Sequence, residues 1–356
     1  MSRPYLIVPQ LIKQPTWGGD YILRLKKWNK KQYQGVKIGQ SYELSGSSRL
    51  ATYASHSDDL QDMMDSNNDQ CILISEIEPV NLLIKLNQAF GNSFQLHIKP
   101  NLHSARWKPK PESWYFLEDG LITLGVCHDT DLGQYKNTCV EIDVFMNNLS
   151  KQVKNSEISL MAARQQAKNF VQKKNPWQFV NKYRVAKYNL IDLSIGGIHH
   201  SWEEDMVNNP NGNIVFEVQL EAGDDKATIR AFDQGKIKDD GSIRKLNIDD
   251  YFNNLNNDPS HNDISFLKRA KQNGNLLKTQ YYTVDIIKID SEICVEGIKT
   301  YQHLYVRDGA VCVVGGNTSV VVKKGNSCFL PSSATKYIIQ KNEPKSVVLR
   351  TYPIYS

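Results

Sequence analysis

The chain lacks several features that mark other classes of protein. Its 356 residues contain no Gly-rich loop of the P-loop or dinucleotide-binding type, which argues against a nucleotide cofactor. No apolar run approaches the length that spans a bilayer, and the N-terminus, Met1–Tyr5, does not lead into the apolar segment of a signal peptide. We therefore expect a cytoplasmic protein that binds no membrane.

Charge and cysteine content argue against two further classes. The net charge is only +5, and no basic block is long enough to form a nucleic-acid track; the pair Lys26-Lys27 is typical of a solvated face. Six cysteines show no CxxC spacing, which indicates buried thiols and neither disulfides nor a sulfur metal site. The slight excess of positive charge would suit an anionic metabolite such as a sugar phosphate.

Short apolar runs separated by turn residues fill most of the chain, and they predict a mainly β protein. Residues 143–178 differ, because Phe145, Leu149 and Val153 follow one another at helical spacing and Pro176 ends the pattern. Residues 276–356 carry many strands at short, regular spacing, as a sandwich or barrel does. We expect one β-domain from residues 1–142 and 179–240, a helical insertion at 143–178, a polar helical or loop connection at 241–275, and a C-terminal β-domain at 276–356.

Polar residues in two strand-like segments suggest a metal site. Because side chains alternate along a strand, Gln95 and His97 share one face with Ser93. Glu112 begins a later strand, and His199 follows two glycines that allow close approach of the backbone. Two imidazoles, a carboxylate and an amide oxygen would make an open shell for a catalytic divalent metal. Spacing alone leaves an alternative, since most single histidines in strands are core or surface residues.

Several segments, taken in order, resemble the type I phosphomannose isomerases, the zinc-dependent mannose-6-phosphate isomerases of the cupin superfamily. The matching segments extend over roughly residues 15–235. They are Trp17-Gly18-Gly19, Ile38–Ser45, Leu82–Lys85, Ser93–His97, Lys110–Glu112, Gly197–His199, Phe216–Gln219 and Thr228–Arg230. The resemblance implies cupin-type (jelly-roll) β-barrels, with the first β-domain as the catalytic cupin and residues 276–356 as a second, cupin-like domain.

The resemblance also implies a reaction and its residues. One Zn²⁺ per chain would be bound by Gln95, His97, Glu112 and His199. Arg230 would lie over the substrate, and Lys110 would act beside the metal-binding glutamate. Ser93 would help to hold the phosphate. The reaction would interconvert mannose 6-phosphate and fructose 6-phosphate through an enediol, as part of carbohydrate metabolism.

Two more residues are candidates on chemical grounds. Glu217 could be the general base, or it could simply pair with Arg230. Lys85 lies on an apolar strand, where a lysine either faces a polar site or extends its charged end to solvent. His200, next to His199 in an extended segment, is expected to point away from the metal, at the surface or behind the site.

Three positions depart from the family's pattern and leave other functions open. Pro109 stands where a histidine is common, Lys99 replaces an acidic residue after the metal-binding histidine, and Lys226 replaces one before Arg230. Asp225 could substitute for the missing carboxylate only if the strand shifted by one residue, which would reverse its face. The alternatives are a non-catalytic cupin that binds a sugar phosphate, as a sensor or structural protein, or an isomerase of another phosphosugar. The sequence leaves the oligomeric state open.

Overall fold

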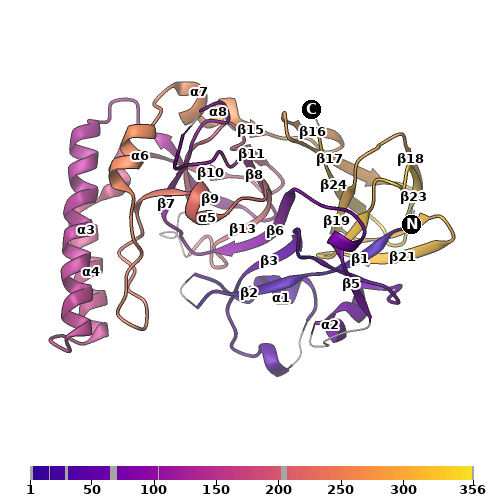
Figure 1. Cartoon of the computed structure of the whole chain (residues 1–356), viewed down its shortest axis with the longest axis horizontal. Coiled ribbons are helices and arrows are strands. Elements are labelled where there is room, and N and C mark those ends of the chain that lie inside the picture. Colours follow the sequence, from indigo (N-terminus) through magenta and orange to yellow (C-terminus); the bar gives the residue numbers. More distant parts are fainter. Residues whose placement is uncertain are drawn as a thin grey trace.

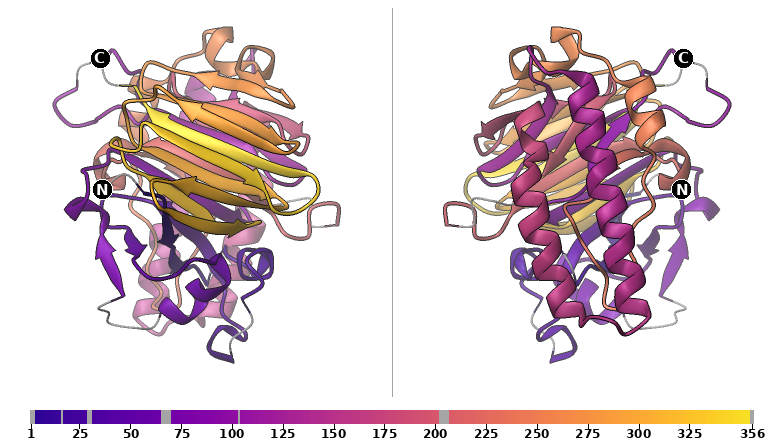
Figure 2. Two further views of the ribbon diagram at one scale, coloured as in Figure 1. Left: turned by 90° about the vertical axis from the view of Figure 1, so that its right-hand side faces the viewer. Right: turned by 90° about the vertical axis from the view of Figure 1, so that its left-hand side faces the viewer.

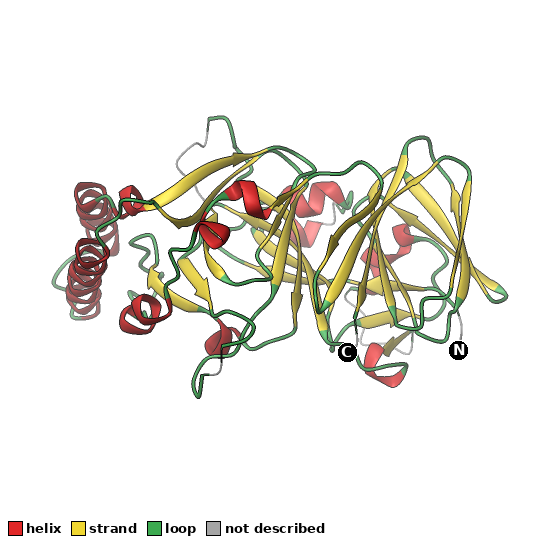
Figure 3. Cartoon of the chain, turned by 90° about the horizontal axis from the view of Figure 1, so that it is seen from above, coloured by secondary structure: helices red, strands yellow, loops and turns green. Residues whose placement is uncertain are grey.

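The computed structural model of the chain describes residues 3–15, 17–28, 31–64, 70–102, 104–201 and 207–354. Among these residues the strands form four antiparallel sheets. The molecule is elongated: a pair of long helices lies at one end, one β-barrel in the middle and a second barrel at the other end (Figure 1, Figure 3). The expected fold class, mainly β with cupin-type barrels and helices, is confirmed.

Two sheets form the first barrel. The seven-stranded sheet contains, in spatial order, β15 (Lys268–Arg269), β11 (Leu190–Asp192), β8 (Glu112–Phe116), β13 (Asn213–Leu220), β6 (Leu82–Ala89), β3 (Ile38–Leu44) and β2 (Gln10–Lys13). The five-stranded sheet contains β10 (Val180–Val185), β9 (Gly120–Val126), β12 (Gly197–Ser201), β7 (Phe94–His97) and β14 (Ile229–Phe232).

Two further sheets form the second barrel. The eight-stranded sheet contains β16 (Gly274–Lys278), β17 (Tyr282–Ile289), β24 (Ser346–Pro353), β19 (Gln302–Asp308), β22 (Ser327–Leu330), β1 (Tyr5–Val8), β4 (Arg49–Ala51) and β5 (Cys71–Leu73). The four-stranded sheet contains β18 (Glu292–Glu296), β23 (Lys336–Lys341), β20 (Ala310–Gly315) and β21 (Thr318–Lys323). The domain limits predicted from sequence stay a prediction, but three N-terminal strands pair within the sheet that the C-terminal segment builds.

The longest helices are α3 (Leu132–Lys154) and α4 (Leu160–Lys174), which cover the outer end of the first barrel (Figure 2). The shorter α-helices are α1 (Tyr21–Leu25), α2 (Leu60–Met63), α5 (Asp224–Ala227), α6 (Ile248–Asn254), α7 (Pro259–Asn262) and α8 (Ile264–Leu267). The 3₁₀ turns are η1 (Lys31–Tyr33), η2 (Ser57–Asp59), η3 (Ile74–Glu76) and η4 (Pro176–Phe179). No helix of the described residues is long and apolar enough to cross a membrane.

Helix α3 begins eleven residues before the helical stretch expected at 143–178. The side chain of Asp131 accepts a hydrogen bond from the backbone N–H of Gln134 and caps the helix. Tyr135, Cys139 and Ile142 then lie three or four residues apart and are buried on one face. The helical pattern was therefore present in residues 132–142, although the sequence analysis assigned them to strands. Pro176 follows the end of α4, as predicted.

Alternation along the strands sends one face to an apolar core and the other to a polar interior. On β6, Ile84 and Leu86 join the core between the two barrels, whereas Lys85 and Asn87 line a pocket inside the first barrel. On β7, Phe94 and Leu96 pack toward the helices, and Gln95 faces the same pocket. The predicted division of faces at Ser93–His97 is thus observed.

The solvated face expected for the pair Lys26-Lys27 holds for Lys27 alone. Lys26 is buried, and its Nζ lies 2.8 Å from Oε1 of Glu43. Lys26 follows the short helix α1, and the next residue, Lys27, has a positive φ that turns the chain. The charges near Lys26 in the sequence could not reveal this, because its partner, Glu43, lies on strand β3.

Candidate functional site

Three buried side chains meet inside the first barrel. His97 of β7 and His199 of β12 come from the five-stranded sheet, and Glu112 of β8 reaches them from the seven-stranded sheet. Their potential ligand atoms all lie within 4.8 Å of one another. Nε2 of His199 is 2.7 Å from Oε1 of Glu112, and Nε2 of His97 is 3.5 Å from Oε2. The three residues are far apart in the sequence, and they come together because the two sheets close into a barrel.

The hydrogen bonds around these residues leave their inward atoms available. Nδ1 of His97 lies 2.6 Å from the carbonyl oxygen of Ala227, and because a carbonyl only accepts, Nδ1 carries the proton and Nε2 keeps a lone pair. Nε2 of His97, both ring nitrogens of His199 and both oxygens of Glu112 are buried without a regular hydrogen bond in the described structure, although Nε2 of His199 and Nζ of Lys110 lie beside the Glu112 carboxylate. Buried polar atoms of this kind need compensation, and a divalent cation would supply it.

The charges of His97 and Glu112 also suit the binding of a cation. Burial lowers the pKa of His97 to about 4, which keeps the imidazole neutral. Burial opposes the charge of Glu112, but nearby Lys110 and the two histidines hold its pKa well below the usual value. The group therefore offers the neutral imidazole of His97, the second imidazole of His199 and a carboxylate, which is a donor set that fits zinc.

Gln95 is two residues before His97 and directly opposite His199 in the pairing of β7 with β12. It is 9% exposed and faces the pocket. Its amide oxygen would complete a four-ligand set with the three residues above. The structure brings the four predicted ligands into one region, and their role as ligands stays a prediction.

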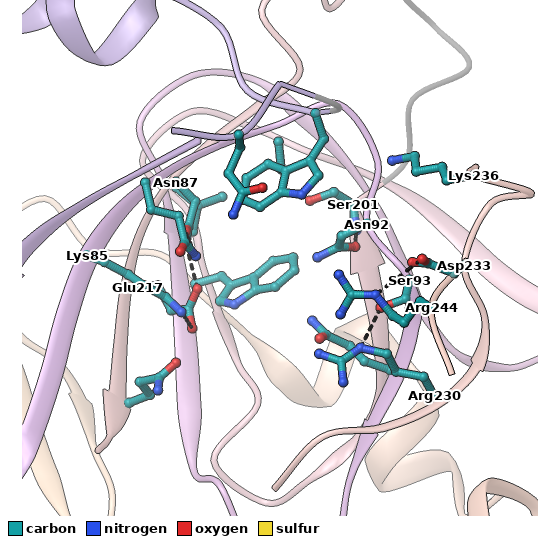
Figure 4. A pocket seen from close by; sticks show the side chains of 18 of the residues that line it. Lys85, Asn87, Asn92, Ser93, Ser201, Glu217, Arg230, Asp233, Lys236 and Arg244 are labelled. Carbon is teal, nitrogen blue, oxygen red and sulfur yellow. Dashed lines mark hydrogen bonds and ion pairs between the residues drawn. The ribbon is translucent and has the colours of Figure 1, made fainter. Parts of the chain in front are cut away.

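The pocket beside this group has a volume of about 580 Å³, within the range of small-molecule sites. Figure 4 shows its two polar walls, with Lys85, Asn87 and Glu217 on one side and Ser93 and Arg230 on the other. Six basic and three acidic side chains of the described residues line it, an excess of positive charge that favours an anionic ligand.

One wall holds the predicted base candidate in a network of charges. Oε1 of Glu217 lies 3.1 Å from Nζ of Lys85 and 4.0 Å from Nζ of Lys110, and Lys110 is also 2.9 Å from Oε2 of Glu112. Lys85 thus faces the pocket and is not extended to solvent. Glu217 pairs with Lys85, on the wall opposite Arg230 (Figure 4). Burial raises the pKa of Glu217, an effect that Lys85 opposes.

The other wall carries Arg230, whose Nε donates a hydrogen bond of 3.0 Å to Oγ of Ser93. Arg230 is the cross-strand partner of Gln95, so it lies next to the proposed ligands. Beyond it in the chain, residues 233–246 bring Lys236 and Arg244 to the same side of the pocket (Figure 4). Nε of Arg244 is 3.2 Å from a carboxylate oxygen of Asp233.

Two further residues were considered from the sequence. His200 lies outside the metal group, as expected, and it is buried behind the site and not at the surface; its ring lies 2.5 Å from Oγ1 of Thr123 and 2.7 Å from Nε2 of Gln234. Asp225 is exposed in the helical turn α5, so it does not replace the carboxylate missing at Lys226.

Gln40, Asn87, Lys236 and Arg244 are among the pocket residues that were not singled out from the sequence. Asn87 was open to prediction, because it lies two residues after Lys85 on the same strand and shares its face. Lys236 and Arg244 belong to a loop without periodicity, and no sequence signal places them.

Comparison with known proteins agrees with this architecture. Residues 272–343 match the family model described as the cupin domain of mannose-6-phosphate isomerase. No curated protein sequence matches the chain significantly. The fold is therefore that of the cupin superfamily, with a His–Glu–His group in the first barrel.

Solved structures show a more particular likeness. A mannose 6-phosphate isomerase from Bacillus subtilis superposes with a TM-score of 0.63 at 13% identity, covering 99% of both chains. A single-residue variant of phosphomannose isomerase from Salmonella typhimurium gives 0.64 at 12% identity, over 99% of this chain and 100% of that one. A zinc-bound mannose 6-phosphate isomerase gives 0.62 at 11% identity, again over 99% and 100%. The resemblance predicted from the sequence is confirmed: the chain has the fold of the type I phosphomannose isomerases.

Proposed function

We propose that the protein is a zinc-dependent aldose–ketose isomerase that interconverts mannose 6-phosphate and fructose 6-phosphate through an enediol. The observation that carries the proposal is the buried His97–Glu112–His199 group, whose potential ligand atoms lie within 4.8 Å of one another, at the side of a positively charged pocket. The likeness of the whole fold to mannose 6-phosphate isomerases supports it.

In this proposal Gln95, His97, Glu112 and His199 hold one Zn²⁺ per chain. When bound, zinc acts as a Lewis acid that stabilises negative charge on a substrate oxygen. The hydrogen bond from His97 to the Ala227 carbonyl fixes the ring in the tautomer that a ligand needs. Lys110, paired with Glu112, restrains that carboxylate from the side of the pocket.

Arg230 supplies the second source of positive charge. Its position opposite Gln95 and its hydrogen bond to Ser93 fix the guanidinium beside the metal group. A fixed cation stabilises the oxygen that becomes negative as the proton leaves the neighbouring carbon. The hydroxyl hydrogen of Ser93 is then directed away from Arg230 and can be donated to the substrate.

The phosphate group would lie beside Lys236 and Arg244. These two residues add to the positive charge on the side of Arg230, and a guanidinium and an ammonium suit phosphate oxygens. The sugar carbons would then lie deeper, between Arg230 and Glu217.

Proton transfer requires a base that can take a proton from one carbon and return it to the next. Glu217 is the carboxylate of the pocket wall opposite Arg230, and burial raises its pKa, which makes its ionised form a stronger base. Lys85 keeps the ionised form accessible by its ion pair with Glu217. The first barrel is thus the catalytic domain in this proposal, and the second barrel supports it.

A coupled assay of fructose 6-phosphate formation tests the proposal. The purified protein is assayed as isolated, after chelation, and after zinc is restored. We expect activity that disappears with chelator and returns with zinc. A folded, zinc-loaded protein without turnover would contradict the enzyme and favour a sugar-phosphate-binding protein, and turnover of a different aldose phosphate would favour another isomerase.

A further inference from the structure

Asn87 contacts the proposed base directly, although no catalytic role has been assigned to it. It lies on β6 two residues after Lys85, is 8% exposed and lines the pocket. Its Nδ2 lies 2.5 Å from Oε2 of Glu217, the oxygen that Lys85 does not contact (Figure 4). An amide donor is thus placed on one carboxylate oxygen and an ammonium on the other.

Gln40 of β3 holds the amide of Asn87 in this orientation. The two residues are cross-strand partners, and Nε2 of Gln40 donates a hydrogen bond of 2.9 Å to Oδ1 of Asn87. Because an ionised carboxylate only accepts, the NH₂ of Asn87 must face Glu217 and its oxygen must face Gln40. These two hydrogen bonds form a relay, in which Gln40 donates to Asn87 and Asn87 donates to Glu217.

We propose that Asn87, oriented by Gln40, is a positioning residue for Glu217: it fixes the plane of the carboxylate in the pocket and stabilises its ionised, proton-accepting form. The inference rests on the proposed function, in which Glu217 moves the proton between two substrate carbons. The proton returns to the substrate within each turnover, so the step needs no oxidant or further reactant.

The charged groups around Glu217 and its burial act on the ionisation of its carboxyl group in opposite directions. Lys85 from the strand of Asn87 and Lys110 from the segment before β8 favour the ionised carboxylate, whereas burial and the charge of Glu112 oppose it. The hydrogen bond from Asn87 also favours the ionised carboxylate, and it does so without adding charge to the pocket. Hydrogen bonds to charged groups are among the stronger ones in proteins, so its loss has a measurable effect.

The test compares Asn87→Leu, Gln40→Leu and the double variant, each folded and loaded with zinc. For Asn87→Leu we expect kcat to fall roughly ten- to a hundredfold with KM within about a factor of two. The acid limb of the kcat profile should shift to higher pH, and further still in Asn87→Asp, which places a second carboxyl group against Glu217. Gln40→Leu should lower kcat less, and adding it to Asn87→Leu should change little, because the relay is already broken.

Asn181→Leu is the matched control. Asn181 also donates hydrogen bonds within the first barrel, to the carbonyls of Val126 and Asn262, but it does not line the pocket. This variant should keep the kcat profile of the unchanged protein. Equal losses in the control, purely additive effects of Gln40 and Asn87, or a change in KM alone would overturn the inference.

The two proposals can fail separately. Turnover by the unchanged protein together with a normal kcat profile in Asn87→Leu would refute the positioning role alone. If the unchanged protein lacks turnover, the isomerase proposal fails, and a titration of the Glu217 carboxyl by isotope-edited infrared spectroscopy then decides on the contact. A pKa that rises in Asn87→Leu supports the inference, and an unchanged one overturns it.

Discussion

The two histidines of the proposed metal centre are held by different kinds of contact. The His97 ring is anchored by a hydrogen bond to the carbonyl of Ala227. The His199 ring is held by packing, since it meets Trp114 edge to face with centroids 5.0 Å apart. Both arrangements fix the ring before a metal binds, which reduces the cost of ordering the ligands.

Removal of either histidine should therefore reduce metal binding. We expect His97→Ala and His199→Ala each to lose most bound zinc, because each deletes one ligand of a small shell. The ratio of zinc to protein, measured by elemental analysis after dialysis, checks this. His200→Asn serves as the control, since His200 is bonded to Thr123 and Gln234 and lies outside the metal group. Full zinc retention in both alanine variants would contradict the assignment.

Arg230 permits a prediction that separates chemistry from metal binding. Arg230→Ala should keep the zinc content and the fold, but kcat should fall roughly 10²- to 10³-fold because a fixed cation at the developing charge is lost. Arg184→Ala, an exposed arginine on β10, is the matched control. Steady-state kinetics with metal analysis on the same samples distinguishes the two effects, and unchanged turnover in Arg230→Ala would show that the arginine has no part in the reaction.

At the scale of elements, the helices matter because they hold a loop of the pocket. Arg164 of α4 donates hydrogen bonds of 3.1 and 2.9 Å to the carbonyl of Ile237 and lies 2.7 Å from a carboxylate oxygen of Asp239. Ser150 of α3 donates one of 2.7 Å to the carbonyl of Gly241. These contacts attach the loop of residues 233–246, which carries Lys236 and Arg244, to the two helices.

Loosening this attachment should weaken substrate binding more than chemistry. For Arg164→Met we expect KM for mannose 6-phosphate to rise several-fold, with kcat changed by less than about a factor of two, because the loop proposed to bind the phosphate loses its anchor while Glu217 and Arg230 stay in place. Lys168→Met, one turn further along α4, is the control. A KM that is the same in both variants would contradict the role of the helices.

The strands explain which parts of the site the sequence could reveal. Alternation predicted the shared face of Ser93, Gln95 and His97, and it could have predicted Asn87 beside Lys85. Ordered motif matches then suggested Glu112 and His199, whose meeting depends on two sheets that no local pattern relates. Partners across strands stayed hidden for the same reason, as the pair of Glu217 with Lys85 and the relay from Gln40 show.

At the scale of the whole molecule, a buried ion pair joins the two barrels. Nζ of Lys26 lies 2.8 Å from Oε1 of Glu43 on β3, and Oγ of Ser327 on β22 donates a 2.9 Å hydrogen bond to the other carboxylate oxygen. Burial lowers the pKa of Lys26, and Glu43 opposes that shift. The pair thus connects a sheet of the first barrel with a sheet of the second.

Breaking this pair should destabilise the protein. Lys26→Met leaves the carboxylate of Glu43 buried without its cation, which costs about 3–5 kcal/mol. We expect the free energy of unfolding, measured with urea, to fall by that amount, and Lys26→Met combined with Glu43→Gln to recover part of it because the isolated charge is gone. Lys27→Met, at the neighbouring exposed lysine, should have little effect. An equally stable Lys26→Met variant would contradict the role of the pair.

The pairing of β1 with β22 has a consequence for how the chain is made. Strand β1 pairs with β4, which is close to it in the sequence, but Tyr5 lies opposite Phe329, so β1 meets its other partner only after β22 has been synthesised. Until then the nascent chain carries an apolar segment, Tyr5–Val8, that is fully buried in the finished molecule. The eight-stranded sheet of the second barrel therefore cannot close around β1 until the strands of the C-terminal segment have been made, whereas the strands of the first barrel precede them in the chain.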